Sequence, residues 1–379
     1  MAVRVAIVGQ GYVGVSVGVA AHEAGHEVIG IEIDAKRLSE LQNFNYSVTS
    51  NFSHVKEAEI VIIAVPTPLD CNLNPDLSFL ESACNLIKPH LAPGTLIINE
   101  STSYPGTLRE VIAESLGDSF GYAVAPERVD PDNIIWNVRN TPRVVGAISE
   151  SALRRAVAFY ESFCQEIVEV SSPEVAEAAK LFENTFRQVN IALVNEFAQI
   201  AYNMGISASE TLSAANTKPF GFMKFSPSVG VGGHCIPVDP SYLSFAASRV
   251  GVEAEFIELA NKLNRQMPQI IADRIDSQFA IQGKKLQIAG LSYKANTADM
   301  RESPSLSLIT ELRSRGAEVI WHDPLVKEYK GEISSPIEKV DLGIICVAHT
   351  GVNYTEWEQT QTKILDLSIS DNLKFPKYF

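Results

Sequence analysis

Short apolar runs alternate with amphipathic stretches over the first third of the chain. Residues 3–8, 59–68 and 94–102 are apolar and rich in β-branched side chains, a pattern typical of strands buried on both faces. Residues 26–34 form a further run of this kind, and stretches suited to helices lie between the runs. This alternation predicts a doubly wound parallel sheet, in which ligands bind at the carboxyl ends of the strands.

A glycine motif, GQGYVG, follows the first of these runs directly. In a GxGxxG motif at this position, Gly9 permits a tight turn, Gly11 lets the backbone approach a pyrophosphate, and Gly14 lets the next helix pack on the strand. The helix N-terminus then receives the phosphates. Glu32, about 20 residues on, is placed to bind a ribose 2′-hydroxyl, which favours NAD over NADP. Arg37 could stack on adenine or pair with a 2′-phosphate.

Three polar residues lie near the carboxyl ends of further predicted strands. Thr67 and Thr102 end two of the apolar runs, and Glu127 ends the run GYAVAPE. Position alone leaves two interpretations open, a ligand contact or an ordinary loop residue.

The segment from Ser172 to Gly205 predicts one long helix. Ser172 is a suitable cap, Pro173 suits the first turn, and nothing breaks the pattern before Gly205. Lys180 and Asn184 are one turn apart and share a face. This face is either solvated, or it directs a cation and an amide at an oxygen that gains negative charge.

The stretch SVGVGGHCIPVDP places Cys235 before a predicted helix, with Asp239 as its cap and Pro240 in its first position. The positive end of a helix favours the thiolate, which is the nucleophilic form. The neighbouring glycines would let the backbone approach a ligand. Adjacent His234 gives poor chelate geometry for zinc, so we predict no metal site. A small buried hydrophobic residue is the remaining alternative.

The last third repeats the strand–loop–helix–strand pattern at 283–324 without a GxGxxG motif, and 341–350 contains another buried run. We therefore predict a second, smaller α/β domain. Lys294 and Arg301 lie in the loop after its first strand, where ligand contacts are expected.

Composition narrows the class of protein. With 379 residues the chain is too long for one ordinary domain, and 46% hydrophobic residues suffice for buried cores. A net charge of −14, with acids and bases interspersed, disfavours nucleic acid and anionic membranes as partners. No apolar run approaches the ~20 residues of a membrane span. Five scattered cysteines without CxxC spacing indicate the reducing cytoplasm, and the N-terminus does not read as a signal peptide.

With these residues assembled, the chain resembles the UDP-glucose/GDP-mannose dehydrogenase family of NAD-dependent nucleotide-sugar 6-dehydrogenases. The resemblance covers nearly the whole length. It rests on GxGYVG at 9–14, VPTP at 65–68, ESTSYPGT at 100–107, APER at 125–128, KLFENTFRQVNIALVNE at 180–196, GVGGHCIPVDP at 230–240 and GLSYKANTADMRESPS at 290–305. GHCIPVDP, with TKPFGF at 217–222, is most similar to the branch that acts on UDP-N-acetylhexosamines, UDP-GlcNAc or UDP-ManNAc.

The resemblance implies two Rossmann-like doubly wound parallel-sheet domains, joined by a long central helix and a helical dimerisation region. It implies an NAD-binding domain at 1–171, a central helical domain with the cysteine loop at 172–270, and a UDP-binding domain at 271–379. A homodimer or higher homo-oligomer and a UDP-sugar substrate are expected partners.

The family reaction oxidises a primary alcohol through an aldehyde to a carboxylate and consumes two NAD per sugar. By resemblance, Cys235 is the nucleophile that forms a thiohemiacetal and then a thioester. Lys180 and Asn184 hold the developing oxyanions, and Asp239 orients Lys180 and a water. Glu127 assists hydrolysis of the thioester, and Thr102 places the water.

The same resemblance implies the ligand contacts. Cofactor contacts are expected at Gly9, Gly11, Tyr12, Val13, Gly14, Glu32, Arg37, Pro66, Thr67, Thr102 and Arg301. Substrate contacts are expected at Glu127, Arg128, Lys180, Asn184, Lys218, Phe225, Gly232, His234 and Lys294.

The chain departs from the family pattern in three places. Residues 41–57 replace a longer segment, ILDLSISDN replaces a stretch with a nucleotide-binding arginine, and SPSVG replaces PGPG. Alternatives therefore stay open: a UDP-glucose 6-dehydrogenase, a one-step β-hydroxyacid-type dehydrogenase with no use for Cys235, or a catalytically silent nucleotide-sugar-binding protein.

Overall fold

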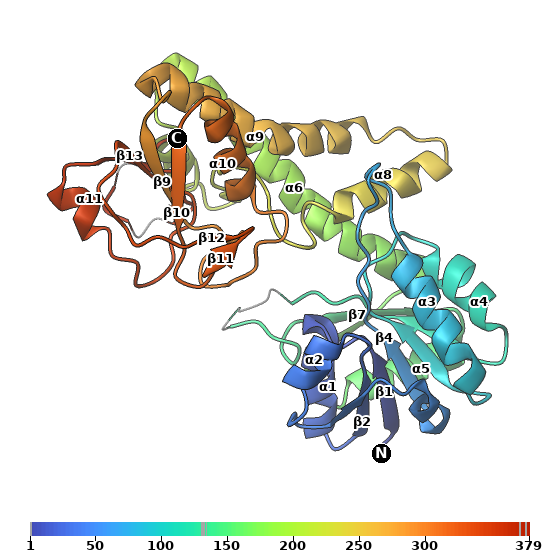
Figure 1. Cartoon of the computed structure of the whole chain (residues 1–379). Coiled ribbons are helices and arrows are strands. Elements are labelled where there is room, and N and C mark those ends of the chain that lie inside the picture. The colour runs from blue at the N-terminus through green and yellow to red at the C-terminus, as the bar shows by residue number, and fades with distance from the viewer. Residues whose placement is uncertain (1, 130–132, 134, 371–372, 376) are drawn as a thin grey trace. The chain divides into compact units, whose positions relative to one another are not determined.

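The computed structural model describes residues 2–129, 133, 135–370, 373–375 and 377–379. The chain divides into two compact units, Met1–Glu183 with Ser241–Glu253 and Asn184–Pro240 with Ala254–Phe379. Figure 1 labels their elements. Residues 371 and 372, which end the stretch ILDLSISDN that differs from the family pattern, lie outside the described residues.

In the described part of the first unit, eight strands form one sheet in the order β3-β2-β1-β4-β5-β6-β7-β8. All pairings are parallel except that of β6 with β7, which is antiparallel. The strands are β1 (Arg4–Val8), β2 (Glu27–Ile31), β3 (Ser47–Thr49), β4 (Ile60–Ile63), β5 (Leu96–Asn99), β6 (Gly121–Val124), β7 (Arg143–Ala147) and β8 (Ile167–Glu169).

Helices cover both faces of this sheet, which is why its central strands are apolar throughout. Val17 of α1 and Ala156 of α5 belong to one buried cluster, and Leu80 of α3 belongs to another. The helical segments are α1 (Tyr12–Glu23), α2 (Ala35–Glu40), η1 (Phe52–Glu57), α3 (Ser78–Ile87), η2 (Lys88–His90), η3 (Leu108–Ala113), α4 (Glu114–Leu116), α5 (Glu150–Tyr160) and most of α8 (Asp239–Arg249).

The shortened segment 41–57 still completes the first sheet. It supplies β3, which pairs in parallel with β2, and then η1. A strand is therefore retained at this edge although the connection is short.

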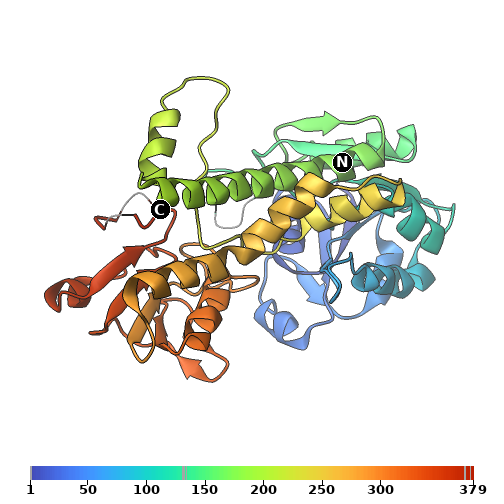
Figure 2. The ribbon, with the colours of Figure 1, turned by 90° about the horizontal axis from the view of Figure 1, so that it is seen from above.

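One helix, α6 (Pro173–Met204), confirms the long helix predicted from the sequence. Figure 2 shows it as a single rod. Residues 173–183 belong to the first unit and the remainder to the second.

In the described part of the second unit, four strands form a parallel sheet in the order β10-β9-β13-β14. They are β9 (Lys285–Ala289), β10 (Glu318–His322), β13 (Leu342–Ile345) and β14 (Lys363–Asp366), beside a ribbon of β11 (Glu328–Tyr329) and β12 (Glu332–Ile333). Met267 of α9 and Leu308 of α10 pack on one face, and Trp357 of α11 packs on the other. The helices are α7 (Ala208–Ala215), α9 (Glu255–Phe279), α10 (Pro304–Ser314) and α11 (Thr355–Gln359). The predicted fold class is confirmed.

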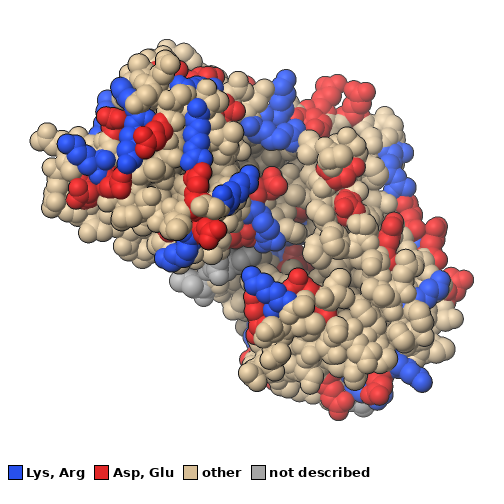
Figure 3. Space-filling view, viewed as in Figure 1, with Lys and Arg blue, Asp and Glu red and all other residues tan. Residues whose placement is uncertain are grey.

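Acidic and basic side chains are interspersed over the face seen in Figure 3. Among the described residues, no helix combines the length and the apolar character needed to cross a membrane.

Candidate active site

The loop between β1 and α1 has the geometry that its glycine motif predicts. Gly9 has a φ of +91°, and a Cβ there would lie 2.4 Å from the carbonyl oxygen of Ala64. A Cβ at Gly14 would lie 2.0 Å from the carbonyl oxygen of Gly9. At Gly11, by contrast, no atom lies within 4 Å of the Cβ position, and no side chain caps α1. This open glycine before an uncapped helix N-terminus fits the pyrophosphate of a dinucleotide.

Glu32 follows β2 and binds the same loop. Its Oε2 accepts the N–H of Gln10 at 2.9 Å, and its Oε1 accepts those of Ile33 and Asp34 at 2.8 and 2.9 Å. A carboxylate has about four acceptor positions, so one position on Oε2 remains for a ligand hydroxyl.

Gln10, to which the sequence analysis assigned no role, is fully buried and organises this edge. Its side-chain oxygen accepts a hydrogen bond from the Tyr46 hydroxyl at 2.7 Å. Its backbone carbonyl accepts one from Nε of Arg37 at 2.8 Å. A Cβ at Gly30 would lie 2.6 Å from the Gln10 amide. Gly30, an isolated glycine within a β-branched strand, was the signal that a buried side chain lies here.

The loops that carry Thr67 and Thr102 are bonded to each other. Pro66 and Thr67 follow β4, and Thr102 follows β5. Oγ of Ser101 accepts the N–H of Val65 at 2.9 Å. The structure thus brings these predicted cofactor residues to adjacent strand ends of the first sheet.

Glu177 of α6 anchors the loop that carries Thr102, and sequence reasoning missed it. Its side chain is buried and accepts the N–H groups of Gly106 and Leu108 at 2.7 and 3.0 Å. Burial raises the pKa of Glu177 to about 7, although these two bonds oppose the rise. Lys180 lies one turn further along the same helix.

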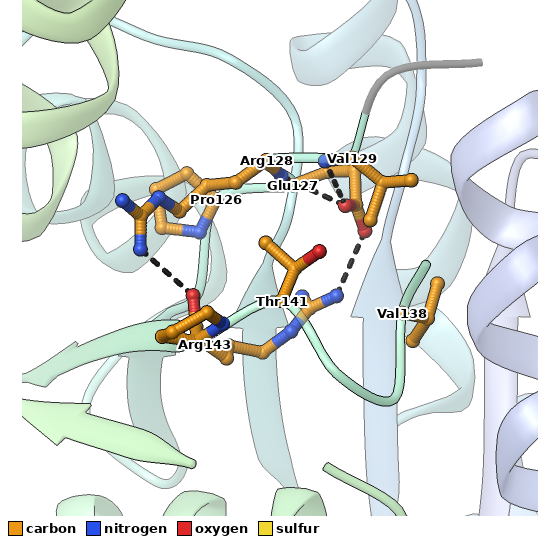
Figure 4. Close-up of a pocket in the computed structure, with 8 residues that line it drawn as sticks. Pro126, Glu127, Arg128, Val129, Val138, Thr141 and Arg143 are labelled. Atoms are coloured by element: carbon orange, nitrogen blue, oxygen red, sulfur yellow. Dashed lines mark hydrogen bonds and ion pairs between the residues drawn. The ribbon is translucent and has the colours of Figure 1, made fainter. Parts of the chain in front are cut away.

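Glu127 is buried in the loop after β6 and held from two sides (Figure 4). Its Oε1 accepts the N–H groups of Arg128 and Val129, both at 2.7 Å, and its Oε2 lies 2.8 Å from Nη2 of Arg143. Burial alone would raise the pKa of Glu127. The charge of Arg143, the two N–H groups and the charge of Lys180 outweigh burial and hold the pKa below its ordinary value.

Arg143, which the sequence analysis also missed, is buried between two carboxylates. Its Nη1 lies 3.1 Å from Oε2 of Glu100, which in turn accepts the hydroxyl of Tyr160 on Oε1 at 2.5 Å. Burial, with a contribution from the charge of Glu127, raises the pKa of Glu100 to about 7 against the opposing charge of Arg143. The small pocket in Figure 4 is lined by Pro126, Glu127, Arg128, Val129, Val138, Thr141, Pro142 and Arg143.

Arg128 directs its side chain away from Glu127. Its guanidinium pairs with Glu183 of α6, with 2.5 Å between Nη2 and Oε1, and donates to the carbonyl of Pro142 at 2.7 Å. Arg128 therefore links the strand-end loop to the long helix.

In the second unit the structure brings Asn184, Asp239 and Cys235 together. Nδ2 of Asn184 donates to Oδ2 of the buried Asp239 at 2.5 Å. The backbone N–H of Asp239 donates to the carbonyl of Cys235 at 2.8 Å. Helix α8 begins at Asp239, one residue earlier than predicted, because the bond from the Asp239 N–H to the Cys235 carbonyl already spans one helical turn.

The glycines before Cys235 are required by packing within the second unit. A Cβ at Gly232 would lie 2.7 Å from Cβ of Tyr293, and Gly233, with a φ of +96°, would meet the Tyr293 ring at 2.9 Å. Packing within the chain therefore excludes a side chain at both positions, and the ligand contact of Gly232 stays a prediction. Cys235 itself is half-buried, with Sγ 3.9 Å from Nδ1 of His234.

Arg301 is held beside the cysteine loop within this unit. Its Nε and Nη2 bind the carboxylate of Asp299 at 3.0 and 2.6 Å, and its carbonyl accepts the N–H of Gly233 at 3.0 Å. Lys294 lies in the same loop between β9 and α10 and is half-buried.

This loop is fixed by a buried group that the sequence analysis did not find. Oδ2 of Asp323 accepts the N–H of Leu291 at 2.8 Å and lies 3.1 Å from Nε2 of His349. Nδ1 of His349 accepts the N–H of Asn296 at 3.0 Å. These bonds tie the loop to the carboxyl ends of β10 and β13, and they depend on long-range register that local patterns do not reveal.

The remaining predicted substrate residues make aromatic contacts in the second unit. Nζ of Lys218 lies 5.0 Å from the ring centre of Phe220, and the ring centre of Phe225 lies 6.0 Å from that of Phe186. Within the described residues, no group of three or more His, Cys, Asp or Glu side chains is arranged to hold a metal ion.

Comparison with known families identifies the class. Residues 3–50 and 40–164 match the NAD binding domain of the UDP-glucose/GDP-mannose dehydrogenase family, 174–266 match its central domain, and 287–372 match its UDP binding domain. The chain belongs to this family and is an NAD-dependent nucleotide-sugar dehydrogenase. The predicted family, enzyme class and cofactor are confirmed.

Individual relatives agree with the predicted branch. The chain is 33% identical over 371 residues to a Methanocaldococcus jannaschii protein named UDP-N-acetyl-D-mannosamine dehydrogenase, covering 91% of this chain and 86% of that one. It is 34% identical over 360 residues to UDP-N-acetyl-D-glucosamine 6-dehydrogenase of Pseudomonas aeruginosa, covering 85% and 83%. The solved UDP-D-ManNAc dehydrogenase of Pyrococcus horikoshii superimposes with a TM-score of 0.87 at 30% identity, covering 99% and 97%.

Proposed function

We propose that this enzyme oxidises the C6 hydroxyl of a UDP-N-acetylhexosamine to the carboxylate through a covalent intermediate on Cys235. The names of its relatives support the substrate class. The observation that carries the mechanism is the cluster in which Asp239 binds both Asn184 and the backbone of Cys235. A one-step dehydrogenase has no use for a cysteine beside this cluster.

The chain's own residues divide the chemistry. The Cys235 thiolate, before the positive end of α8, attacks the aldehyde carbon to form a thiohemiacetal. Lys180 and Asn184 stabilise the oxyanions, and Asp239 orients the Asn184 amide through the bond described above. When bound, NAD would supply the hydride acceptor for both oxidations, alcohol to aldehyde and thiohemiacetal to thioester, and the hydroxyl proton of the alcohol is released to solvent.

Hydrolysis then releases the product. The oxygen of a water bonds to the thioester carbonyl carbon while Glu127 takes one proton of that water, and Thr102 positions it. The C–S bond breaks, the proton returns to the departing thiolate, and the acid gives its own proton to solvent. The depressed pKa of Glu127 keeps this base ionised at neutral pH.

The remaining contacts complete the proposal. NAD would be held at Gly9, Gly11, Tyr12, Val13, Gly14, Glu32, Arg37, Pro66, Thr67 and Arg301, and the open Gly11 cradle supports this. The UDP-sugar would also contact Arg128, Lys218, Phe225, Gly232, His234 and Lys294.

Domain division, assembly and location are further parts of this proposal. We place an NAD-binding domain at 1–171, a central helical domain at 172–270 and a UDP-binding domain at 271–379. Exposed apolar residues of α6, Phe186, Leu193 and Ile200, recur every seven positions and support a homodimer or larger assembly through this helix. Five cysteines with no disulfide bond between them fit a reducing cytoplasm.

The test is NADH formed per sugar, followed by absorbance, with UDP-ManNAc, UDP-GlcNAc and UDP-glucose each limiting in turn. Two NADH per sugar, lost in Cys235→Ala, is the expected result. Cys71→Ala is the matched control, because Cys71 is an exposed thiol.

Other outcomes would replace the proposal. One NADH per sugar that survives Cys235→Ala would make the enzyme a one-step dehydrogenase. Oxidation of UDP-glucose alone would move it to the other branch of the family. Binding of UDP-sugars without NADH would make it a silent nucleotide-sugar-binding protein.

A further inference from the structure

Three neighbouring strands of the first sheet converge where Arg143 is buried. β5 and β6 run parallel and end at the same edge, where Glu100 and Glu127 follow them. Because β7 runs antiparallel to β6, its first residue, Arg143, starts at that edge too. Strand direction therefore brings one guanidinium between two carboxylates that are distant in the sequence.

This guanidinium is fixed on every side. Arg143 is 3% exposed and contacts Glu127 at 2.8 Å, Glu100 at 3.1 Å and the carbonyl of Ala125 at 3.1 Å. Its Cζ lies 4.7 Å above the ring centre of Tyr160, whose hydroxyl binds Glu100. A planar guanidinium can bridge two carboxylates in this way, whereas the ammonium of a lysine is a point charge without the fork.

The contacts leave Glu127 with one free acceptor position. Both positions of Oε1 are used by the N–H groups of Arg128 and Val129. One position of Oε2 is used by Arg143 (Figure 4). Of about four positions on a carboxylate, one position on Oε2 therefore remains for a water molecule.

We propose that Arg143 is a positioning residue for hydrolysis of the thioester, because it fixes the orientation and the negative charge of Glu127. Glu100 balances the positive charge of Arg143. The proposal rests on the proposed function, in which Glu127 takes a proton from water. Arg143 acts through Glu127 and takes part in neither oxidation.

The decisive variant is Arg143→Lys, studied in the full-length enzyme with NAD and the UDP-sugar that the wild type oxidises. We expect the first two NADH per active site to form as fast as in the wild type, followed by steady-state turnover slowed about tenfold or more. General-base catalysis is worth roughly 10²–10⁴-fold, which bounds the loss. Intact-protein mass spectrometry should show the acyl group on Cys235, and added hydroxylamine should restore turnover by cleaving the thioester.

Two matched variants separate positioning from folding. Tyr160→Phe removes the hydroxyl bond to Glu100 but leaves Glu127 and Arg143 in contact. It should lower thermal stability without accumulating acyl-enzyme. Arg155→Lys changes an exposed arginine that binds the carbonyls of Gly94 and Glu59, and it should behave as wild type.

A second measurement keeps the proposal testable if Arg143→Lys does not fold. Glu127 is faced by Arg143 from β7, by Lys180 from α6 and by Glu100 from the end of β5. Glu100→Gln removes the second carboxylate that pairs with Arg143. Because the pKa of Glu100 is about 7, the wild-type rate of thioester hydrolysis should change as the pH rises through 7 and Arg143 becomes shared between two carboxylates, whereas Glu100→Gln should show no change there.

The outcomes distinguish the two levels of the proposal. A wild type that forms fewer than two NADH per sugar overturns the proposed function itself. A normal wild type with an Arg143→Lys variant that slows formation of the first two NADH, or that accumulates no acyl-enzyme, overturns the role of Arg143 alone. A change in the rate near pH 7 that persists in Glu100→Gln also contradicts that role.

Discussion

β1 and β9 occupy equivalent places in the two sheets, each between two parallel neighbours. Each is followed by a glycine with a φ of +91°, Gly9 in the first unit and Gly290 in the second. Each glycine N–H donates at 2.8 Å to the backbone carbonyl of the last residue of the neighbouring strand, Ile31 in the first unit and His322 in the second. In both units, a Cβ on the glycine would lie 2.4 Å from a carbonyl oxygen, that of Ala64 in the first unit and that of Val347 in the second.

An acidic residue follows the neighbouring strand in both sheets, but its partners differ. Glu32 accepts three N–H groups and keeps a position for a ligand. Asp323 receives five donors, namely the N–H groups of Leu291, Ser292, Leu325 and Val326 and the ring of His349.

The two crossovers show that the backbone geometry and the ligand chemistry are separable. The same turn serves both sheets, yet only the first leaves an acceptor position and an open glycine, Gly11. Asp323 has no position left for a ribose hydroxyl, so it fixes the loop of Lys294 and does not itself bind ligand.

Removing the shared glycines should have the largest effect. Gly9→Ala and Gly290→Ala each combine a strained positive φ with a clash against a carbonyl oxygen at 2.4 Å. We expect each to destabilise its unit by about 2–4 kcal/mol in urea unfolding. Gly94→Ala, with a φ of +84° but open space, should cost less. Equal losses of unfolding free energy in Gly94→Ala and Gly290→Ala would show that the contact with the carbonyl oxygen contributes nothing.

Asp323→Asn should have the next largest effect, about 2–3 kcal/mol, because an amide leaves buried N–H donors without an acceptor. The pKa of Asp323 lies below its usual range, since burial is outweighed by the bond from His349 and the N–H bonds. Its ionised form therefore stabilises the fold above the ordinary carboxyl pKa of about 4, and this stability is lost as the pH falls through the lower folded-state value.

Unfolding of the wild type and Asp323→Asn across pH 2–7 tests this sign. The difference between them should be full at neutral pH and narrow below about pH 4. Glu32→Gln, at the equivalent place in the first sheet, should cost much less because Glu32 is only half-buried. A gap that widens in acid would contradict the assignment.

Glu32→Ser should alter cofactor choice more than stability. Loss of the carboxylate removes a ribose acceptor and a charge that repels a 2′-phosphate. We expect the ratio of kcat/KM for NADP to that for NAD to rise about tenfold, which is ~1.4 kcal/mol. Glu23→Ser, at an exposed glutamate paired with Arg139, is the control and should leave the ratio unchanged.

Gly11→Ala should have the smallest effect on stability, since nothing lies within 4 Å of the added Cβ. It should still weaken NAD binding, measured by titration, because the methyl group occupies the pyrophosphate cradle. A stability loss matching that of Gly9→Ala would show that the two glycines serve the same purpose.

Local patterns predicted much of the first unit. The runs around β1, β2, β4 and β5, the glycine motif and the long helix all lie within a few residues of their predicted places, because strand burial and helix punctuation are local properties. Local patterns did not predict that Gly232 and Gly233 pack on Tyr293, because Tyr293 comes from a distant loop.

The sequence by itself determined the two-sheet architecture, the NAD-binding turn and the family, because buried strands, GxGxxG and the cysteine loop are contiguous stretches of chain. Only the tertiary structure decided that Arg143 lies between Glu100 and Glu127, and that Asp323 is saturated while Glu32 is not. Both depend on strand order and direction, which place distant charges at one sheet edge. Each hydrogen bond that the carboxylate accepts there occupies one acceptor position, so the number of bonds decides whether the carboxylate can still bind a ligand.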